Sequence, residues 1–280
     1  MENIVRTIYG SFLQTCNLLG LPFSRKANTT LNEKFNIQAD TLPGMSEMPK
    51  MRYFAIGNGG HRMSIGSEGI AIPQPIQHRS KDAALFHHLP FVLREPQDDL
   101  ANTERANYGL RREETWNGVR YIAYYLKRIP LGTVVAEMEY KTVNAGQPVT
   151  TPFIPDSSNL NPTPPELSPT GVNVVTGDYT TASAKISLAL SAWDVTELLN
   201  VAKVIYDNED YAIISEVGLV SGIDKVIQVA GIGASVINFN EVICAQVVSH
   251  ISTFYPLRFS TNGTELILDV GATEPLYSLN

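Results

Sequence analysis

The sequence predicts an α+β protein dominated by antiparallel β-sheet, sandwich-like, with an N-terminal amphipathic helix and one or two short helices. Three observations lead to this fold class. Runs rich in Val, Ile and Tyr recur along the chain, turn residues are frequent (20 Gly and 17 Pro), and helical periodicity is confined to a few stretches. With 280 residues, 44% of them hydrophobic and 18% charged, the chain is long enough for one large domain or two modest ones.

The first helix is predicted over residues 3–20, where apolar side chains recur at steps of three to four and Gly20 and Pro22 follow. The apolar positions are Ile4, Ile8, Phe12, Cys16 and Leu19. This face can pack on its own domain or dock on a partner subunit, and the sequence leaves both open.

Two further helices are expected. Residues 193–207 have helical periodicity, and Asp194 or Thr196 is the expected cap. A short helix is expected to begin at Asn102 or Thr103 and to hold Arg111 and Arg112 in its last turn, in keeping with the helix dipole.

Asn-Gly dipeptides predict two hairpins, because both turn residues of a type I′ turn need positive φ. Asn117-Gly118 separates the clearest pair of β-prone runs, and Asn262-Gly263 separates a second pair within "LRFSTNGTELILDVG". We also expect strands over "TVVAEMEYKTV", "YAIISEVGLVSG" and the long run "NFNEVICAQVVSHISTFYPL".

Seven prolines in the 22 positions of residues 148–169 predict a semi-rigid extended arm or linker that cannot pair in a sheet. The predicted organisation is therefore a mixed α/β N-terminal part over 1–147, a proline-rich arm over 148–169, and a β-rich C-terminal part over 170–280.

The net charge of −7 is unevenly distributed. Residues 1–136 hold 16 basic and 12 acidic side chains, whereas residues 137–280 hold 5 and 16. Such asymmetry favours ordered assembly, because one end of a molecule can attract the other end of a neighbour. The basic residues alternate with acids and form no stripe, so direct nucleic-acid binding is not expected.

Motifs for cofactors, metals and targeting are not recognised. The glycines at 57, 59 and 60 are followed by no Gly-Lys-Ser/Thr and no helix, so a phosphate loop is not expected. Cys16 and Cys244 lie far apart, which argues against a disulfide or a metal site. We read no signal peptide and no membrane span. Catalytic, cofactor-binding and metal-binding residues are therefore all expected to be none, and no cofactor is expected.

His87-His88 is the nearest approach to a catalytic motif. Adjacent residues of a strand point to opposite faces, so the two rings are not expected to converge on one metal or substrate. A hydrolase using either ring with Asp98 or Asp99 stays open as a minor alternative, since no nucleophile accompanies them.

A dense mixed-charge band surrounds these residues, with seven basic and six acidic side chains over 94–128. Such a band suits bidentate ion-pair networks within the protein or across a subunit seam. The interaction candidates are Arg94, Arg105, Arg111, Arg112, Trp116 and Arg120.

Two segments resemble virion structural proteins of contractile-tailed bacteriophages. The first is "DAALFHHLPFVLREPQDDLANTERANYGLRREETWNGVRYIAYYLKRI". The second is "YAIISEVGLVSG" followed by "FNEVICAQVVSHISTFYPL" and "ELILDVGATEPLY", whose "ISEVGL" element resembles a strand of tail, baseplate and tail-collar proteins.

The resemblance implies a non-enzymatic virion subunit, assembled in the bacterial host cytoplasm. The expected role is a tail baseplate component that binds other virion proteins, as a homo-oligomer or symmetric multi-copy assembly, with neither nucleic acid nor membrane as a direct partner. A neck or head–tail connector protein is the first alternative. A receptor- or carbohydrate-binding tail module, for which Trp116 is the residue to test, is the second.

Overall fold

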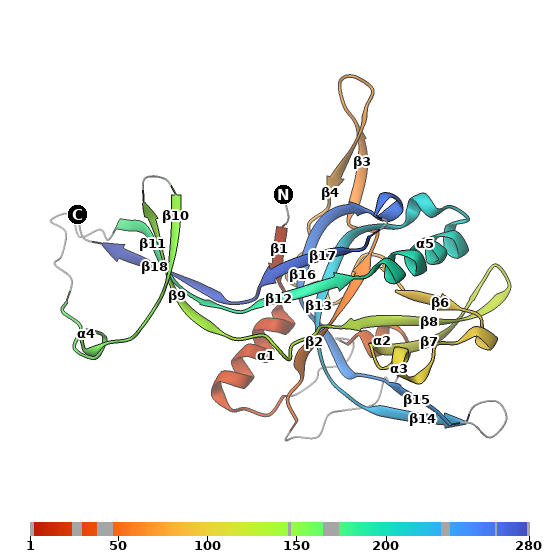
Figure 1. The fold of residues 1–280 in the computed structure, drawn as a ribbon, viewed down its shortest axis with the longest axis horizontal. Helices are drawn as coiled ribbons and strands as arrows, with labels where there is room; N and C mark the ends of the chain where they lie inside the picture. The colour runs from red at the N-terminus through yellow and green to blue at the C-terminus, as the bar shows by residue number, and fades with distance from the viewer. Residues whose placement is uncertain are drawn as a thin grey trace. The chain divides into compact units, whose positions relative to one another are not determined.

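The computed structural model describes residues 3–23, 30–37, 47–144, 147–164, 174–230, 236–260 and 262–278. These residues form mainly antiparallel β-sheet with few helices, which confirms the mainly-β, α+β class (Figure 1). Parts of the expected loop before residue 50 and of the expected proline-rich arm lie outside them.

The strands are β1 (Asn3–Arg6), β2 (Lys50–Gly57), β3 (His61–Ile65), β4 (Ala71–Pro75), β5 (His88–Leu89), β6 (Val92–Arg94), β7 (Tyr108–Trp116), β8 (Val119–Arg128), β9 (Glu137–Asn144), β10 (Gln147–Pro152), β11 (Val174–Ser183), β12 (Lys185–Leu190), β13 (Ile213–Ile223), β14 (Val226–Ala230), β15 (Val236–Asn240), β16 (Ile243–Pro256), β17 (Thr264–Asp269) and β18 (Ala272–Ser278). The α-helices are α1 (Ile8–Leu19), α2 (Leu31–Lys34), α3 (Asn102–Arg105), α4 (Ser157–Leu160) and α5 (Ala192–Tyr206). Single 3₁₀ turns are η1 (Pro96–Asp98), η2 (Glu209–Tyr211) and η4 (Leu257–Phe259).

The chain divides into two compact units: unit 1 is Met1–Ile129 with Ala189–Glu265, and unit 2 is Pro130–Leu188 with Leu266–Asn280. This division differs from the predicted 1–147, 148–169 and 170–280. The reason is long-range strand pairing, since β13 and β16 from the second half of the chain pair with β2 and β1 from the first.

Unit 1 is built on an eight-stranded sheet with the order β1-β16-β13-β2-β8-β6, in which β5 also pairs with β2 and β7 with β8. β13 lies in the middle of this order, and nine of its eleven residues are buried. Its two faces are therefore both covered, as expected for a strand with a nearly continuous apolar sequence. The hairpins β3–β4 and β14–β15 form separate two-stranded sheets.

The hairpin predicted at Asn117-Gly118 is confirmed. β7 and β8 pair from Trp116↔Val119 to Tyr108↔Lys127, and the turn residues have φ values of 50° and 80°. Arg111 and Arg112 lie on β7, so their predicted place in the last turn of a helix is wrong. α3 ends at Arg105 because the β-prone run that follows it pairs with β8.

The first helix is shorter than predicted. Residues Asn3–Arg6 form β1, paired with β16, and the helix begins only at Ile8. Thr7 caps it by accepting a hydrogen bond from the Gly10 amide at 3.0 Å. Gly20 ends it with a φ of 62°, as the sequence indicates.

The helix predicted over 193–207 is present as α5, with a different cap. Ser191 is the N-cap and forms a reciprocal capping box with Asp194. α5 lies beside β6 in unit 1.

Unit 2 contains a four-stranded sheet with the order β10-β9-β11-β18. The prediction that residues 148–169 cannot pair in a sheet is wrong for β10. Its pairing with β9 survives because the Phe153 amide donates to the Met138 carbonyl at 2.9 Å, which places the nitrogens of Pro148 and Pro152 on the outer side of an edge strand.

The hairpin predicted at Asn262-Gly263 is wrong. The segment before it forms η4, and β17 after it pairs with β12. Gly263 does have a positive φ of 85°, but it serves a connection and not a two-strand turn.

Candidate functional site

The six interaction candidates lie on β6, α3, β7 and β8 of unit 1, and each contacts an acidic side chain within that unit. Among these candidates, the most buried are those that contact Asp99. Its carboxylate accepts from Arg105 at 3.2 Å, from Arg111 at 3.0 Å, and from the Tyr124 hydroxyl. The side chains of Asp99 and Arg105 are each only 9% exposed.

The electrostatics of this group follow from its burial and pairing. Burial raises the pKa of the Tyr124 hydroxyl, and the adjacent Asp99 carboxylate raises it further. Burial alone would lower the pKa of Arg111, but its hydrogen bond to Asp99 outweighs that effect and the pKa is raised. The guanidinium group of Arg111 also lies over the Phe239 ring, 5.3 Å from its centroid. The hydrogen bonds and ion pairs of this group are therefore made within unit 1.

The remaining candidates tie neighbouring elements together. Arg94 pairs with Glu197, which fastens β6 to α5. Arg112 lies 3.8 Å from Glu114 and over the Phe35 ring. The Trp116 indole donates to Glu114 at 2.8 Å. Arg120 pairs with Glu113, and with 62% of its side chain exposed it is the candidate most open to solvent.

His87 and His88 diverge, as the sequence predicts. The His87 ring lies 2.7 Å from the Asn58 amide oxygen and 3.2 Å from the Tyr206 hydroxyl. The His88 ring accepts a hydrogen bond from the Leu85 amide at 3.1 Å and packs against Phe35. Burial lowers the pKa of His88 well below its ordinary value, and the nearby Lys34 adds to the effect.

Sequence reasoning missed the most buried charged group of the described residues, Glu216 on β13, which has no exposed surface. One carboxylate oxygen accepts from the amides of Gly59 and His87 at 3.0 and 2.8 Å. The other accepts from the Phe86 amide at 2.8 Å and meets Nε2 of His78 at 2.7 Å. A single glutamate within the apolar run "AIISEVGLVSG" was the signal that could have found it.

His78 extends this group into a stack of rings. It lies between Phe86 and His250, with ring centroids 3.9 Å away on each side. His250 is joined to the Asp82 carbonyl at 3.0 Å, and burial lowers its pKa. The cluster fastens the segments around Gly59 and Phe86 onto β13. With both Glu216 and the His78 side chain fully buried, it offers a substrate no access.

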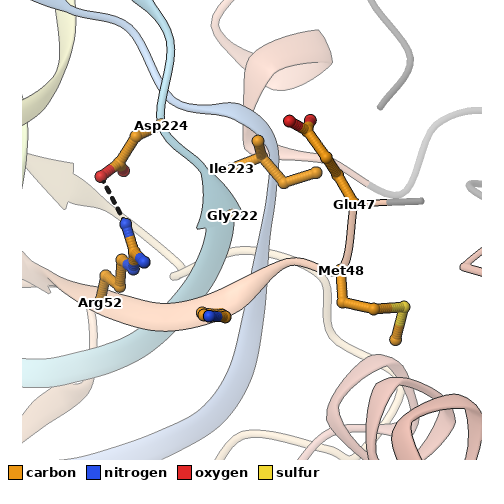
Figure 2. A pocket seen from close by; sticks show the side chains of 7 residues that line it. Glu47, Met48, Arg52, Gly222, Ile223 and Asp224 are labelled. Atoms are coloured by element: carbon orange, nitrogen blue, oxygen red, sulfur yellow. Dashed lines mark hydrogen bonds and ion pairs between the residues drawn. The ribbon is translucent and has the colours of Figure 1, made fainter. Parts of the chain in front are cut away.

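Figure 2 shows a pocket of about 450 Å³ beside the ends of β2 and β13. Arg52 donates to Asp224 at 2.7 Å, and Arg128 and the Tyr53 hydroxyl bond the same carboxylate at 3.0 and 2.7 Å. Burial alone would raise the pKa of Asp224, but these bonds hold it below its ordinary value. The Arg52–Asp224 part of the pocket wall is thus an ion-pair network, and Glu47, Met48 and Lys50 also line the pocket.

A second pocket of about 550 Å³ lies between β6, β8 and α5. It is lined by Leu93, Arg94, Glu95, Gln97, Asp98, Tyr121, Thr196, Glu197, Asn200 and Val204. Three carboxylates and one guanidinium share it with a single aromatic ring, so the lining is polar and acidic.

Among the described residues, no group of three or more His, Cys, Asp or Glu side chains could hold a metal ion. No helix in this part of the chain is long and apolar enough to cross a membrane. His87 and His88 contact Asn58 and Leu85, whereas Asp98 and Asp99 contact arginines, so these hydrogen bonds do not join the histidines to the aspartates.

Residues 1–280 match the model of DUF7208, a family of unknown function. The chain belongs to this family. Neither a curated protein nor a solved structure matches the chain. Membership of a family of unknown function assigns no activity to it.

Proposed function

We propose that this DUF7208 protein is a non-enzymatic structural subunit of a contractile-tailed bacteriophage virion, a tail baseplate component that binds other virion proteins during assembly. One observation carries the proposal. The ionisable groups that were the best candidates for catalysis form hydrogen bonds and ion pairs inside unit 1. Large apolar side chains, in contrast, are exposed on several elements. Uncovered apolar surface is typical of proteins that function in contact with others.

The resemblance to virion proteins supports the same proposal. Its first segment corresponds to β5–β8, which includes the Asp99 group, and its "ISEVGL" element lies in β13. Both are rigid, well-packed parts of unit 1, suited to hold exposed surfaces in fixed positions. The proposal includes virion localisation, a multi-copy state, and neither nucleic acid nor membrane as a direct partner. The sandwich-like packing and the docking role of the N-terminal helix stay predictions.

Immunogold labelling of the protein on intact phage particles tests the proposal. Gold at the distal end of the tail is the expected result. Gold at the head–tail junction would replace the baseplate role with the alternative of a neck connector. The absence of gold from native and partly disassembled particles would reject the virion role altogether.

The pocket between β6, β8 and α5 supports a second candidate, a carbohydrate-binding tail module. Its volume lies within the range of small-ligand sites, and Tyr121, Asn200 and Gln97 supply an aromatic face and planar amides that suit a sugar. The three lining carboxylates would exclude anionic glycans. Glycan-array binding that is lost in Tyr121→Ala but kept in Trp116→Ala would favour this pocket over the hairpin tip. Silence of the wild-type protein on the array would reject the candidate.

A further inference from the structure

Residues 76–87 lead from β4 to β5 without forming a helix or a strand. They lie on one face of β13 and β16, the face that carries Glu216, Gly218, His250 and Ser252. The register places these four residues together, since Glu216 opposes Ser252 and Gly218 opposes His250. We call residues 76–87 the strap.

Three side chains of this face hold the strap. Ser252 and His250 each donate to a carbonyl of the strap at 3.0 Å. Glu216 accepts from two strap amides at 2.8 Å and meets the His78 ring at 2.7 Å. Backbone hydrogen bonds join other points of the strap to Ile8, Asn58 and Gly60.

Apolar packing adds little to this attachment. Within the strap only the side chains of His78 and Leu85 are buried, and Phe86 is 44% exposed. Gly218 leaves room for Leu85, because a Cβ at Gly218 would lie 3.3 Å from Leu85 Cδ2. A segment with few buried apolar contacts opens at a lower free energy than the core of the sheet. The strap can therefore open while the sheet of unit 1 stays folded.

His250 has a partner for only one of its two ring nitrogens. Its Nε2 contacts the Asp82 carbonyl, so Nε2 carries the hydrogen and Nδ1 has the lone pair in the neutral ring. Nδ1 is buried and has no hydrogen-bond partner among the described residues. A proton added to Nδ1 would create a buried donor without an acceptor and a buried positive charge. Opening of the strap exposes the ring to water and removes both costs.

The charged groups around His250 act in both directions. Burial lowers the pKa of His250, and the His78 ring, stacked 3.9 Å away, lowers it further. The hydrogen bond to the Asp82 carbonyl and the carboxylates of Asp82 and Glu216 raise the pKa, but the lowering effects outweigh them. The other ionisable side chains of the strap and of β1, β3 and β5 beside this site are Arg6, His61, Arg79, Lys81, His87 and His88.

We propose that acid releases the strap from β13 and β16, with His250 as the group that takes up the proton. The inference goes beyond the proposed function and does not rest on it. The ring has its ordinary pKa of about 6.5 when the strap is open and a lower pKa when the strap is closed. The ratio of open to closed strap is therefore constant above pH 6.5 and rises by up to about tenfold per pH unit below it.

Release of the strap has two effects on unit 1. It uncovers the Glu216 carboxylate, which loses the two strap amides and the His78 ring as partners. It also breaks the hydrogen bond from the Ile8 amide to the Ser80 carbonyl. Acid therefore acts both at the middle of the sheet and at the first residue of α1.

Hydrogen–deuterium exchange of the full chain tests the inference, with rates corrected for the intrinsic pH dependence of exchange. The amides of Phe86 and His87 donate to Glu216 and report the closed strap, whereas the amides of β8 report global unfolding. Between pH 7.5 and pH 5.5 the strap amides should exchange up to about tenfold faster while β8 stays protected. Unchanged exchange of the strap amides, or an equal loss of protection in β8, would overturn the inference.

His250→Gln identifies the group that takes up the proton. The glutamine amide can still donate to the Asp82 carbonyl but does not titrate, so the change in strap exchange between the two pH values should fall below twofold. His87→Gln is the matched control, because it removes an exposed ring of the strap and should keep the wild-type change. Circular dichroism establishes that each variant is folded. A wild-type pH dependence in His250→Gln would contradict the assignment, and so would a His88→Gln variant that has lost this dependence.

Discussion

Replacing Glu216 by glutamine should cost about 3 kcal/mol of unfolding free energy. The carboxylate has four partners, the amides of Gly59, Phe86 and His87 and the ring of His78. Glutamine has one carbonyl oxygen, which can keep two of them. His78 can adopt the tautomer that accepts from the new NH₂ group, but one backbone amide is left buried without an acceptor.

The magnitude follows from these partners. A buried donor without an acceptor costs about 1–3 kcal/mol, and each retained bond loses about 1 kcal/mol when its acceptor becomes neutral. Relief from burying a charge offsets part of this cost. The glutamine side chain has nearly the same volume, so no cavity contributes.

Equilibrium unfolding in urea measures the effect. Glu113→Gln is the matched control, because that carboxylate is 50% exposed and pairs only with the exposed Arg120, so its loss should cost less than about 1 kcal/mol. If the unfolding free energy of Glu216→Gln lay within 1 kcal/mol of that of the control, the view that the cluster around Glu216 stabilises unit 1 would be refuted.

Three further predictions concern stability. The folded-state pKa of His88 lies well below its unfolded value of about 6.5, so the unfolded chain binds the proton more readily. The contribution of His88 to the unfolding free energy should therefore be constant above pH 6.5 and fall by up to about 1.4 kcal/mol per pH unit below it. Urea midpoints at pH 7.5, 6.5 and 5.5 check this. The midpoint of His88→Gln should depend less on pH than that of the wild type, and an identical pH dependence of the two would contradict the prediction. Asp99→Asn leaves two buried arginines without a counter-ion and should cost about 3–5 kcal/mol, read as a lower melting temperature, whereas Arg120→Ala should change it little. Gly118→Ala should cost about 1–2 kcal/mol in the same assay, because φ is 80° there and the surrounding space is open; an unchanged melting temperature would argue against the type I′ turn.

The parts of the fold that sequence reasoning predicted are those with local causes. Asn117-Gly118 fixes its own turn, and the two flanking runs pair immediately. α5 has a continuous apolar face, which predicted the helix although its capping box over Ser191–Asp194 was not foreseen. Such signals lie within a short window of sequence, so pattern and turn chemistry suffice.

The parts that it did not predict depend on distant residues. Asn3–Arg6 continues the helical pattern, yet it forms β1 because β16 offers an edge. β10 pairs despite two prolines because both nitrogens face outward, and this depends on its register with β9. Neither the register nor the free edge is visible in the local sequence.

The candidate site, too, was predicted from local sequence only in part. The mixed-charge band indicated ion-pair networks, and the structure has them within unit 1. Glu197 and Asp99 could not be chosen from sequence as the partners of Arg94 and Arg111, because other carboxylates lie nearer to both arginines along the chain. Glu216 was overlooked although it is the single glutamate of the run "AIISEVGLVSG", because that run does not show which distant groups its carboxylate contacts.

The pairing of β1 with β16 has a consequence for how the protein is made. Asn3 pairs with Ser252, which is translated about 250 residues later. β18, which completes the sheet of unit 2, is translated later still. Contacts of such long sequence separation fold slowly. A nascent chain therefore lacks a finished sheet in either unit until β16 and β18 have been translated.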